Sequence, residues 1–237
     1  MRSSAASDGY KRQSLADAKC YLRVAGIMKE YSQAGDMMVV SAAGSTTNQL
    51  ISWLKLSQSD RLAAHQVQQS LRRYHTELIG GLLEPAAADT LIAAFIHDLE
   101  RLAGLLDGGV SEAVYAEVVG HGEVWSARLM AAVLNQLGME AAWLDARAFL
   151  RAERAAQPQV DEGLSYPLLQ QLMAQHPNKR LVVTGFISRN QAGETVLLGR
   201  NGSDYSATQI GALAGASRVT IWSDVAGVYS ADPRKVK

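Results

Sequence analysis

Short apolar runs alternate along this chain with longer segments of helical periodicity, and this alternation restricts the fold more than any other feature. Five runs have the length and composition of strands, at residues 37–41, 141–145, 180–186, 194–199 and 218–223. The segments between them repeat apolar residues at helical spacing, which predicts helices at 14–31, 46–56, 65–78, 86–106, 111–137, 166–175 and 204–215. Such alternation is typical of α/β proteins with a largely parallel sheet. We therefore expect a three-layer αβα sandwich around a mainly parallel sheet.

The length and composition of the chain suffice for one large domain with a well-filled core. Of its 237 residues, 48% are hydrophobic, and chains of this size bury most of their surface on folding. Segment 59–137 has almost only helical periodicity, which predicts a helical layer or small lobe outside the sheet. Tryptophans, Trp143 and Trp222 among them, are expected in the core, and His75 is expected on the surface.

Charge, hydropathy and cysteine content exclude several classes of protein. The 23 basic residues balance the 23 acidic ones, so the chain lacks the basic character of proteins that bind nucleic acid or anionic membranes. The most apolar stretch, 86–96, contains Asp89 and falls short of the roughly 18 to 20 residues of a membrane helix. The single cysteine, Cys20, excludes an internal disulfide, and the start of the chain lacks the apolar centre of a secretion signal. A cytoplasmic protein is expected.

Residues 198–207, Leu-Gly-Arg-Asn-Gly-Ser-Asp-Tyr-Ser-Ala, have the composition of an anion-binding loop at a strand-to-helix junction. Gly199 and Gly202 would bracket the turn, and the helix start behind it would present unpaired backbone N–H groups to a phosphate or carboxylate. Arg200 would add a two-pronged grip on a carboxylate. The alternative is an ordinary tight turn in which Arg200 points into water.

Five phrases of the sequence occur together in one known family. They are Val-Ser-Ala-Ala-Gly-Ser-Thr-Thr-Asn at 40–48, Val-Gly-His-Gly-Glu at 119–123, Thr-Gly-Phe-Ile at 184–187, Gly-Arg-Asn-Gly-Ser-Asp-Tyr-Ser-Ala at 199–207, and Val-Thr-Ile-Trp-Ser-Asp-Val-Ala-Gly-Val-Tyr-Ser-Ala-Asp-Pro-Arg at 219–234. In this order and at this spacing they resemble the aspartate kinases of the amino-acid kinase family. The resemblance covers residues 14–237 and is strongest to the kinase portion of bifunctional aspartokinase/homoserine dehydrogenases of type II. It implies the amino-acid kinase, or carbamate kinase-like, fold.

The resemblance implies transfer of the γ-phosphate of ATP to the β-carboxylate of L-aspartate, the first step of the pathway to lysine, threonine and methionine. A carboxylate acceptor is already ionised at neutral pH, so positioning and positive charge matter more than a general base. By motif, Arg200 would grip a substrate carboxylate and Glu123 would face the substrate amino group. For Glu123 the alternative is a solvated surface glutamate on a helix.

The same motifs imply roles for four further residues. Ser41 and Thr47 would contribute hydroxyls and amides around the acceptor and the phosphate. Ser203 would bind substrate from the Gly-Arg-x-Gly-Ser-Asp loop, and Asp204 would be the catalytic residue that orients neighbouring donors. The alternatives are an ordinary turn serine for Ser41 and a helix N-cap for Thr47.

A nucleotide-binding segment is implied at the end of the chain. Its polar side chains would contact adenine, ribose and phosphates, and they are Ser223, Asp224, Tyr229, Asp232 and Arg234. The alternative for the Asp-Pro pair at 232–233 is a simple turn. Mg²⁺ would arrive with ATP and bind phosphate oxygens, so no protein metal site is expected. No Gly-x-Gly-x-x-Gly fingerprint occurs, and no NADPH site is expected.

The chain departs from the family pattern near its start. Aspartate kinases open with Lys-Phe-Gly-Gly-[Ser/Thr]-Ser, whose lysine contacts the transferred phosphate. Here Gly9-Tyr10-Lys11-Arg12-Gln13 stands in that place, so Gly9 replaces the lysine and long basic residues replace both glycines. We therefore expect residues 1–13 to be an altered, non-family segment and residues 14–237 to be a partial kinase domain, incomplete at both ends. Turnover is expected to be very low, because one lost positive donor lowers a rate on the order of a hundredfold.

Two alternatives to an active aspartate kinase stay open. One is a catalytically inactive fragment that acts as a ligand-binding or interaction module. The other is a related kinase with a different acceptor. In each case L-aspartate or a similar acid and ATP would be the ligands, with no nucleic acid or membrane partner, and homo-oligomers are compatible with the resemblance.

Overall fold

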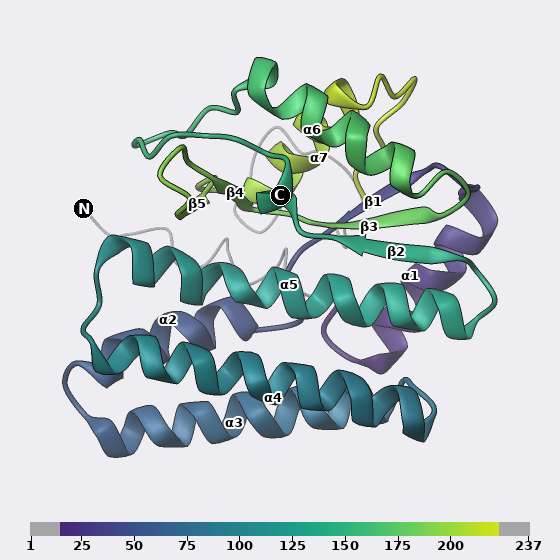
Figure 1. Cartoon of the computed structure of the whole chain (residues 1–237). Coiled ribbons are helices and arrows are strands. Elements are labelled where there is room, and N and C mark those ends of the chain that lie inside the picture. The colour runs from purple at the N-terminus through teal and green to yellow at the C-terminus, as the bar shows by residue number, and fades with distance from the viewer. Residues whose placement is uncertain (1–14, 223–237) are drawn as a thin grey trace, which may run out of the picture.

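A three-stranded parallel sheet lies between helices in the computed structural model, which describes residues 15–222 (Figure 1). The strand order is β1 (Met37–Val40), β3 (Arg180–Thr184) and β2 (Ala141–Leu144), and both outer strands run parallel to β3. A separate antiparallel hairpin is formed by β4 (Ile187–Arg189) and β5 (Thr195–Leu197). The expected α/β class with a mainly parallel sheet is confirmed.

Helices cover both faces of the sheet and add a further layer (Figure 1). The helices of the described residues are α1 (Ala18–Tyr31), α2 (Thr46–Ser57), α3 (Arg61–Gly80), α4 (Pro85–Asp107), α5 (Glu112–Gln136), the 3₁₀ turn η1 (Ala146–Ala148), α6 (Glu162–Gln175) and α7 (Gly202–Leu213). α6 and α7 lie on one face of the sheet, and α5 lies on the other with α1 and α2 beside it. α3 and α4 pack outside α5 and α2, and they form the expected helical layer.

Acidic and hydroxyl side chains start several of these helices. Asp17 accepts a hydrogen bond from the backbone N–H of Cys20 at 2.8 Å, and Asp60 and Ser111 cap α3 and α5 in the same way. Each cap satisfies an N–H group that has no partner inside the helix. The first helix therefore begins at Ala18, behind the Asp17 cap, and the expected start at residue 14 is wrong.

The sheet separates two hydrophobic clusters, and β3 contributes to both. Val182 points into the larger cluster, which fills the space between the sheet and the layers of α1 to α5. Leu181 and Val183 point to the opposite side, against α6 and α7. This arrangement follows from the alternation of side chains along a strand, and it explains why three consecutive positions, 181–183, are all apolar.

Three sequence expectations about strands need correction. The expected strand at 180–186 ends at Thr184, because the chain turns at Phe186, whose φ is +66°. The expected strand at 194–199 is present as β5 but pairs antiparallel with β4, outside the parallel sheet. Residues 218–222 form no strand in the structure, and Trp222 is 58% exposed, with its ring 5.7 Å from that of Tyr31.

Trp143 was also expected in the core, and that expectation is wrong. Its side chain is 37% exposed on β2, and the Arg128 guanidinium lies 4.7 Å from its ring centroid. The two rings of Trp53 and Trp125 are buried as expected. Across the described part of the chain, no helix combines the length and apolar character needed to cross a membrane.

Candidate functional site

A backbone hydrogen bond connects the carboxyl ends of β1 and β3, and two predicted site residues, Ser41 and Ser203, lie beside it. The backbone N–H of Gly185 donates to the carbonyl of Val40 at 2.8 Å, so Ser41 follows directly after this junction. On the other side of Gly185 lies Ser203, and a Cβ added to Gly185 would stand 2.7 Å from the Cβ of Ser203. Glycine at 185 thus allows the start of α7 to approach the sheet edge. Ser41 and Ser203 are both half-buried and flank the same backbone turn.

The loop 198–203 is held against the Thr-Gly-Phe-Ile phrase by a set of short hydrogen bonds. Leu198 N–H donates to the Phe186 carbonyl at 2.8 Å, and the Ser206 hydroxyl accepts from Phe186 N–H and donates to the Gly202 carbonyl. Within the loop, Gly199 and Asn201 have φ of +80° and +56°, a region that favours glycine and asparagine. The turn therefore has one defined shape that presents the first amides of α7.

Two charged residues with predicted roles, Arg200 and Asp204, lie in or next to this loop. Arg200 is exposed at the tip of the turn, and Asp204 is half-buried in the first turn of α7. The N-terminus of a helix carries a partial positive charge and unpaired N–H groups. Together with the guanidinium of Arg200, this makes the loop a chemically suitable place for a carboxylate or phosphate. The structure leaves the particular roles of Arg200, Ser203 and Asp204 as predictions.

Glu123 lies in the most deeply buried part of α5, where the alternative of a solvated surface glutamate is wrong. It is 3% exposed. The neighbouring Gly122 lets the helix touch the loop after β1: a Cβ there would stand 2.8 Å from the Cβ of Ala42 and 3.1 Å from Cγ2 of Thr46. The Val-Gly-His-Gly-Glu phrase and the Val-Ser-Ala-Ala-Gly-Ser-Thr-Thr-Asn phrase, far apart in sequence, are therefore in contact.

The start of α2 is anchored from the outer helical layer. The Thr46 hydroxyl and His75 Nε2 are 3.0 Å apart, in a buried hydrogen bond between α2 and α3. His75 is 2% exposed and lies among aromatic rings, so its expected surface position is wrong. Burial lowers the pKa of His75 to about 3, which keeps the ring neutral at physiological pH. Thr47 lies in the first turn of α2, behind Ser45 at the N-cap position, so it is not itself the cap.

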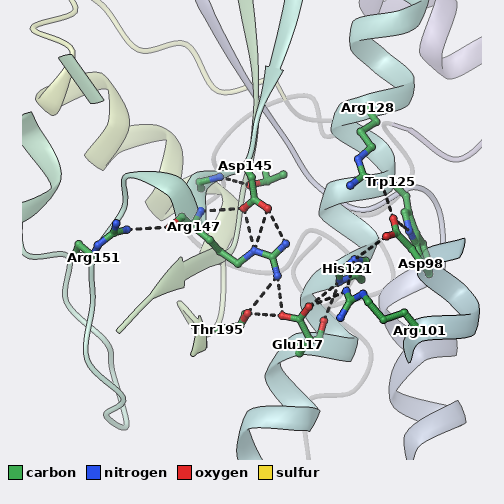
Figure 2. A network of polar contacts seen from close by, with 12 residues as sticks. Asp98, Arg101, Glu117, His121, Trp125, Arg128, Asp145, Arg147, Arg151 and Thr195 are labelled. Atoms are coloured by element: carbon green, nitrogen blue, oxygen red, sulfur yellow. Dashed lines mark hydrogen bonds and ion pairs between the residues drawn. The ribbon is translucent and has the colours of Figure 1, made fainter. Parts of the chain in front are cut away.

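Glu117, also on α5, is the centre of a polar network that joins four elements (Figure 2). Its carboxylate accepts from Arg147 of η1 at 2.7 Å, from the Thr195 hydroxyl of β5 at 2.6 Å and from Arg101 of α4 at 2.9 Å. Burial by itself would raise the pKa of Glu117, but the charge of Arg147 and the hydrogen bond from Thr195 outweigh it and lower the pKa to about 2. Glu117 is therefore ionised throughout the neutral range.

A second carboxylate ties α5 to α4 further along the helix (Figure 2). Asp98 accepts from the indole N–H of Trp125 at 3.2 Å and from Arg128 at 2.5 Å, and it lies 3.9 Å from Nε2 of His121. Burial opposes ionisation of Asp98, but the contacts with His121 and Arg128 lower its pKa to about 2. His121 also approaches Arg101 at 3.1 Å, and it thus serves the packing of α5 against α4.

Five predicted nucleotide-binding residues lie outside the described residues, as does the altered segment 9–13. The five are Ser223, Asp224, Tyr229, Asp232 and Arg234. Sequence reasoning also missed the anchoring side chains His75, Glu117 and Arg147, because their importance comes from partners on other elements. Within residues 15–222, no group of three His, Cys, Asp or Glu side chains is arranged to hold a metal ion.

Comparison with known proteins identifies the class to which this fold and site belong. The model of the amino acid kinase family matches residues 13–237, and the chain belongs to that family. It is 84% identical over 224 residues to the bifunctional aspartokinase/homoserine dehydrogenase 2 of Escherichia coli K12, over 94% of this chain and 28% of that protein. It is 34% identical to an aspartokinase of Chlamydia pneumoniae, over 84% of this chain and 43% of that protein.

A solved structure agrees with the sequence comparison. The crystal structure of E. coli aspartokinase III in complex with aspartate and ADP matches with a TM-score of 0.83 at 28% identity, over 93% of this chain and 49% of that chain. The fold is therefore that of the aspartate kinases. The chain spans less than a third of the bifunctional relative and about half of the aspartokinase III chain.

Proposed function

We propose that this chain is the aspartate-binding part of an aspartate kinase, in which the γ-phosphate of ATP is transferred to the β-carboxylate of L-aspartate. The observation that carries the proposal is the meeting of the buried Glu123 segment, the loop after β1 and the Arg200 loop around the ends of β1 and β3. In parallel α/β sheets, ligands bind beyond the carboxyl ends of the strands. The 84% identity to the bifunctional E. coli protein and the aspartate-bound structure of aspartokinase III support the choice of aspartate.

The proposed roles follow from the charges that the substrates carry. Arg200 and the first amides of α7 would hold a substrate carboxylate, and Glu123 would hold the ammonium group from the opposite side. Ser41, Thr47 and Ser203 would donate hydrogen bonds around the acceptor, and Asp204 would orient them. With one carboxylate and the ammonium group held in this way, the β-carboxylate of aspartate would face the nucleotide. Such fixed donors stabilise the charge that builds up during phosphoryl transfer.

The nucleotide is proposed to be ATP with Mg²⁺, by analogy with the ADP of the aspartokinase III structure. Mg²⁺ would be carried by phosphate oxygens and water, as is usual when phosphates supply most of its ligands. Ser223, Asp224, Tyr229, Asp232 and Arg234 are the proposed nucleotide contacts. We place the protein in the cytoplasm, where a chain with a single cysteine, Cys20, stays reduced.

Acceptor binding is the direct test of this function. In calorimetric titrations of the purified chain, we expect L-aspartate to bind more tightly than L-glutamate or N-acetylglutamate. Arg200→Ala should weaken aspartate binding at least tenfold, because a charge-assisted pair is lost. The matched control is Arg189→Ala, which removes another exposed arginine, on β4, and should leave affinity unchanged. Preference for either of the other two acids would contradict the aspartate assignment, and unchanged affinity in Arg200→Ala would contradict the role of that residue.

The inactive-module alternative rests on a specific observation, the Gly9-Tyr10-Lys11-Arg12-Gln13 segment in place of the family motif. We expect ATP-dependent aspartyl hydroxamate formation by the chain to be very slow. The triple change Gly9→Lys, Lys11→Gly, Arg12→Gly should raise the rate if the segment is responsible, because it restores a positive donor and room for backbone amides. A rate close to that of an intact aspartate kinase without these changes would contradict the expectation.

A further inference from the structure

Glu123 can recognise a substrate amine only if α5 is held at one place along its own axis. Glu117 and Glu123 lie six residues apart on this helix, which corresponds to about 9 Å of rise. Between them, Gly120 and Gly122 face other elements without side chains of their own. A Cβ at Gly120 would stand 2.6 Å from Cγ2 of Ile187 on the β4–β5 hairpin. A small displacement of α5 would therefore change both the packing of Gly120 against Ile187 and the position of the Glu123 carboxylate.

The Glu117 carboxylate is fixed to the sheet edge through a continuous set of contacts. Arg147, its partner, is held by Asp145, whose carboxylate accepts from Nε at 3.0 Å and from Nη2 at 2.6 Å. The turn that carries Arg147 is tied to the end of β3, because Ala146 N–H donates to the buried hydroxyl of Thr184 at 2.8 Å. Thr184 directly precedes Gly185, the residue in contact with Ser203. The end of β3 thus determines where Arg147, and hence Glu117, can lie.

We propose that Glu117, Arg147 and Thr195 are positioning residues that fix α5 along its axis so that Glu123 stands opposite the substrate amine. The inference deepens the proposed aspartate-binding function and rests on the role of Glu123 in it. Three observations carry it: Arg147 and Thr195 converge on one carboxylate oxygen of Glu117, Arg147 is buried and doubly bound to Asp145, and α5 meets the β4–β5 hairpin at Gly120. The contacts come from η1 and β5, so the anchor acts from the sheet side (Figure 2).

Ligand selectivity distinguishes a positioning role of these residues from a purely stabilising one. Succinate has both carboxylates of aspartate and lacks the amine, so the ratio of the two dissociation constants measures recognition of the amine. Thr195→Val removes one hydrogen bond to Glu117 and keeps the size of the side chain, whereas Thr195→Ser keeps the hydroxyl. We expect Thr195→Val and Glu117→Gln to reduce the preference for aspartate over succinate at least fivefold, Glu123→Gln to abolish it, and Thr195→Ser to retain it.

Asn135→Ala is the matched control for loss of hydrogen bonds on α5. Asn135 bonds to Ala141 in both directions, at 2.9 and 3.0 Å, and ties α5 to the strand that follows it directly in the chain. Its removal should lower the urea midpoint and leave the selectivity ratio unchanged. If wild type prefers aspartate and Thr195→Val keeps that preference, the positioning proposal is wrong. If the folded wild type shows no preference, the proposed role of Glu123 fails first, and the positioning proposal fails with it.

Discussion

His75 shows how much one buried side chain can contribute without any signal in the local sequence. It lies on α3, in a segment with many polar residues, yet its ring fills a space between Tyr74, Phe95 and Trp125. Its single polar contact in the described structure is the hydrogen bond to Thr46 at the start of α2. A neutral imidazole can fill an apolar site and still satisfy a hydroxyl. His75 therefore couples the outer helical layer to the loop that carries the predicted substrate-binding hydroxyls.

Stability should fall with acidification because His75 cannot take up a proton in the folded state. Its pKa is about 3 when folded and about 6.5 when unfolded. Below pH 6.5 the unfolded chain binds a proton that the folded chain does not, so the free energy of unfolding decreases as the pH falls. Between pH 7.5 and 5.5, we expect wild type to lose about 1.4 kcal/mol more than His75→Gln. Urea denaturation at the two pH values measures this difference, and parallel losses in the two proteins would contradict it.

At the scale of elements, glycines inside the helices α5 and α4 lie in two different kinds of environment. Gly122 faces Ala42 and Thr46 at distances that leave no room for a methyl group. Gly104, in α4, is exposed and has nothing within 4 Å of where its Cβ would be. The first glycine is needed for close approach, and the second only lowers the helix propensity of its segment.

The two alanine substitutions should therefore change stability in opposite directions. Gly122→Ala is expected to destabilise the protein by about 1 to 3 kcal/mol, because α5 must move away from the loop after β1. Gly104→Ala should stabilise it by about 0.5 to 1 kcal/mol. Both values come from urea denaturation of the purified chain. Gly122→Ala should also weaken aspartate binding, and an unchanged or increased stability of that variant would contradict the close packing described here.

Elements with a strong local pattern were predictable, and features set by distant partners were not. The seven expected helices are all present in the described structure, because their apolar spacing is local information. The end of β3 at Thr184 was missed because the apolar run continues through Phe186 and Ile187. The exposure of Trp143 depends on the neighbour Arg128, which lies on another element. For the site, the motif residues could be named from the sequence, but the Glu117–Arg147 anchor needed three-dimensional contacts.

At the scale of the whole molecule, β3 and α5 are the elements that pack against the most different parts of the fold. β3 separates the two hydrophobic clusters and is paired on both sides. In α5, 16 of 25 residues are buried, and the helix contacts the sheet, the β4–β5 hairpin, α1, α2 and α4. Elements that cannot open without breaking most of the core are expected to exchange their amide hydrogens only by global unfolding.

Hydrogen exchange should therefore follow the layers of the molecule. We expect peptides from α5 and β3 to exchange slowest, and peptides from α6, where only Ser165 and Leu169 are buried, to exchange markedly faster. Mass spectrometry of the native chain measures both in one time course. Equal protection of α5 and α6 would mean that the molecule opens as a single unit.

The buried environment of Trp125 gives the protein its own optical reporter. Trp125 lies two residues beyond Glu123, with its N–H bound to Asp98 and its ring 4.8 Å from that of Phe95. Trp143 and Trp222 are exposed, so acrylamide should quench their fluorescence and leave the emission of the shielded rings. The remaining signal then comes from Trp53 on α2 and Trp125 on α5, so ligand-induced changes around the helix that carries Glu123 and around α2 become visible without a label.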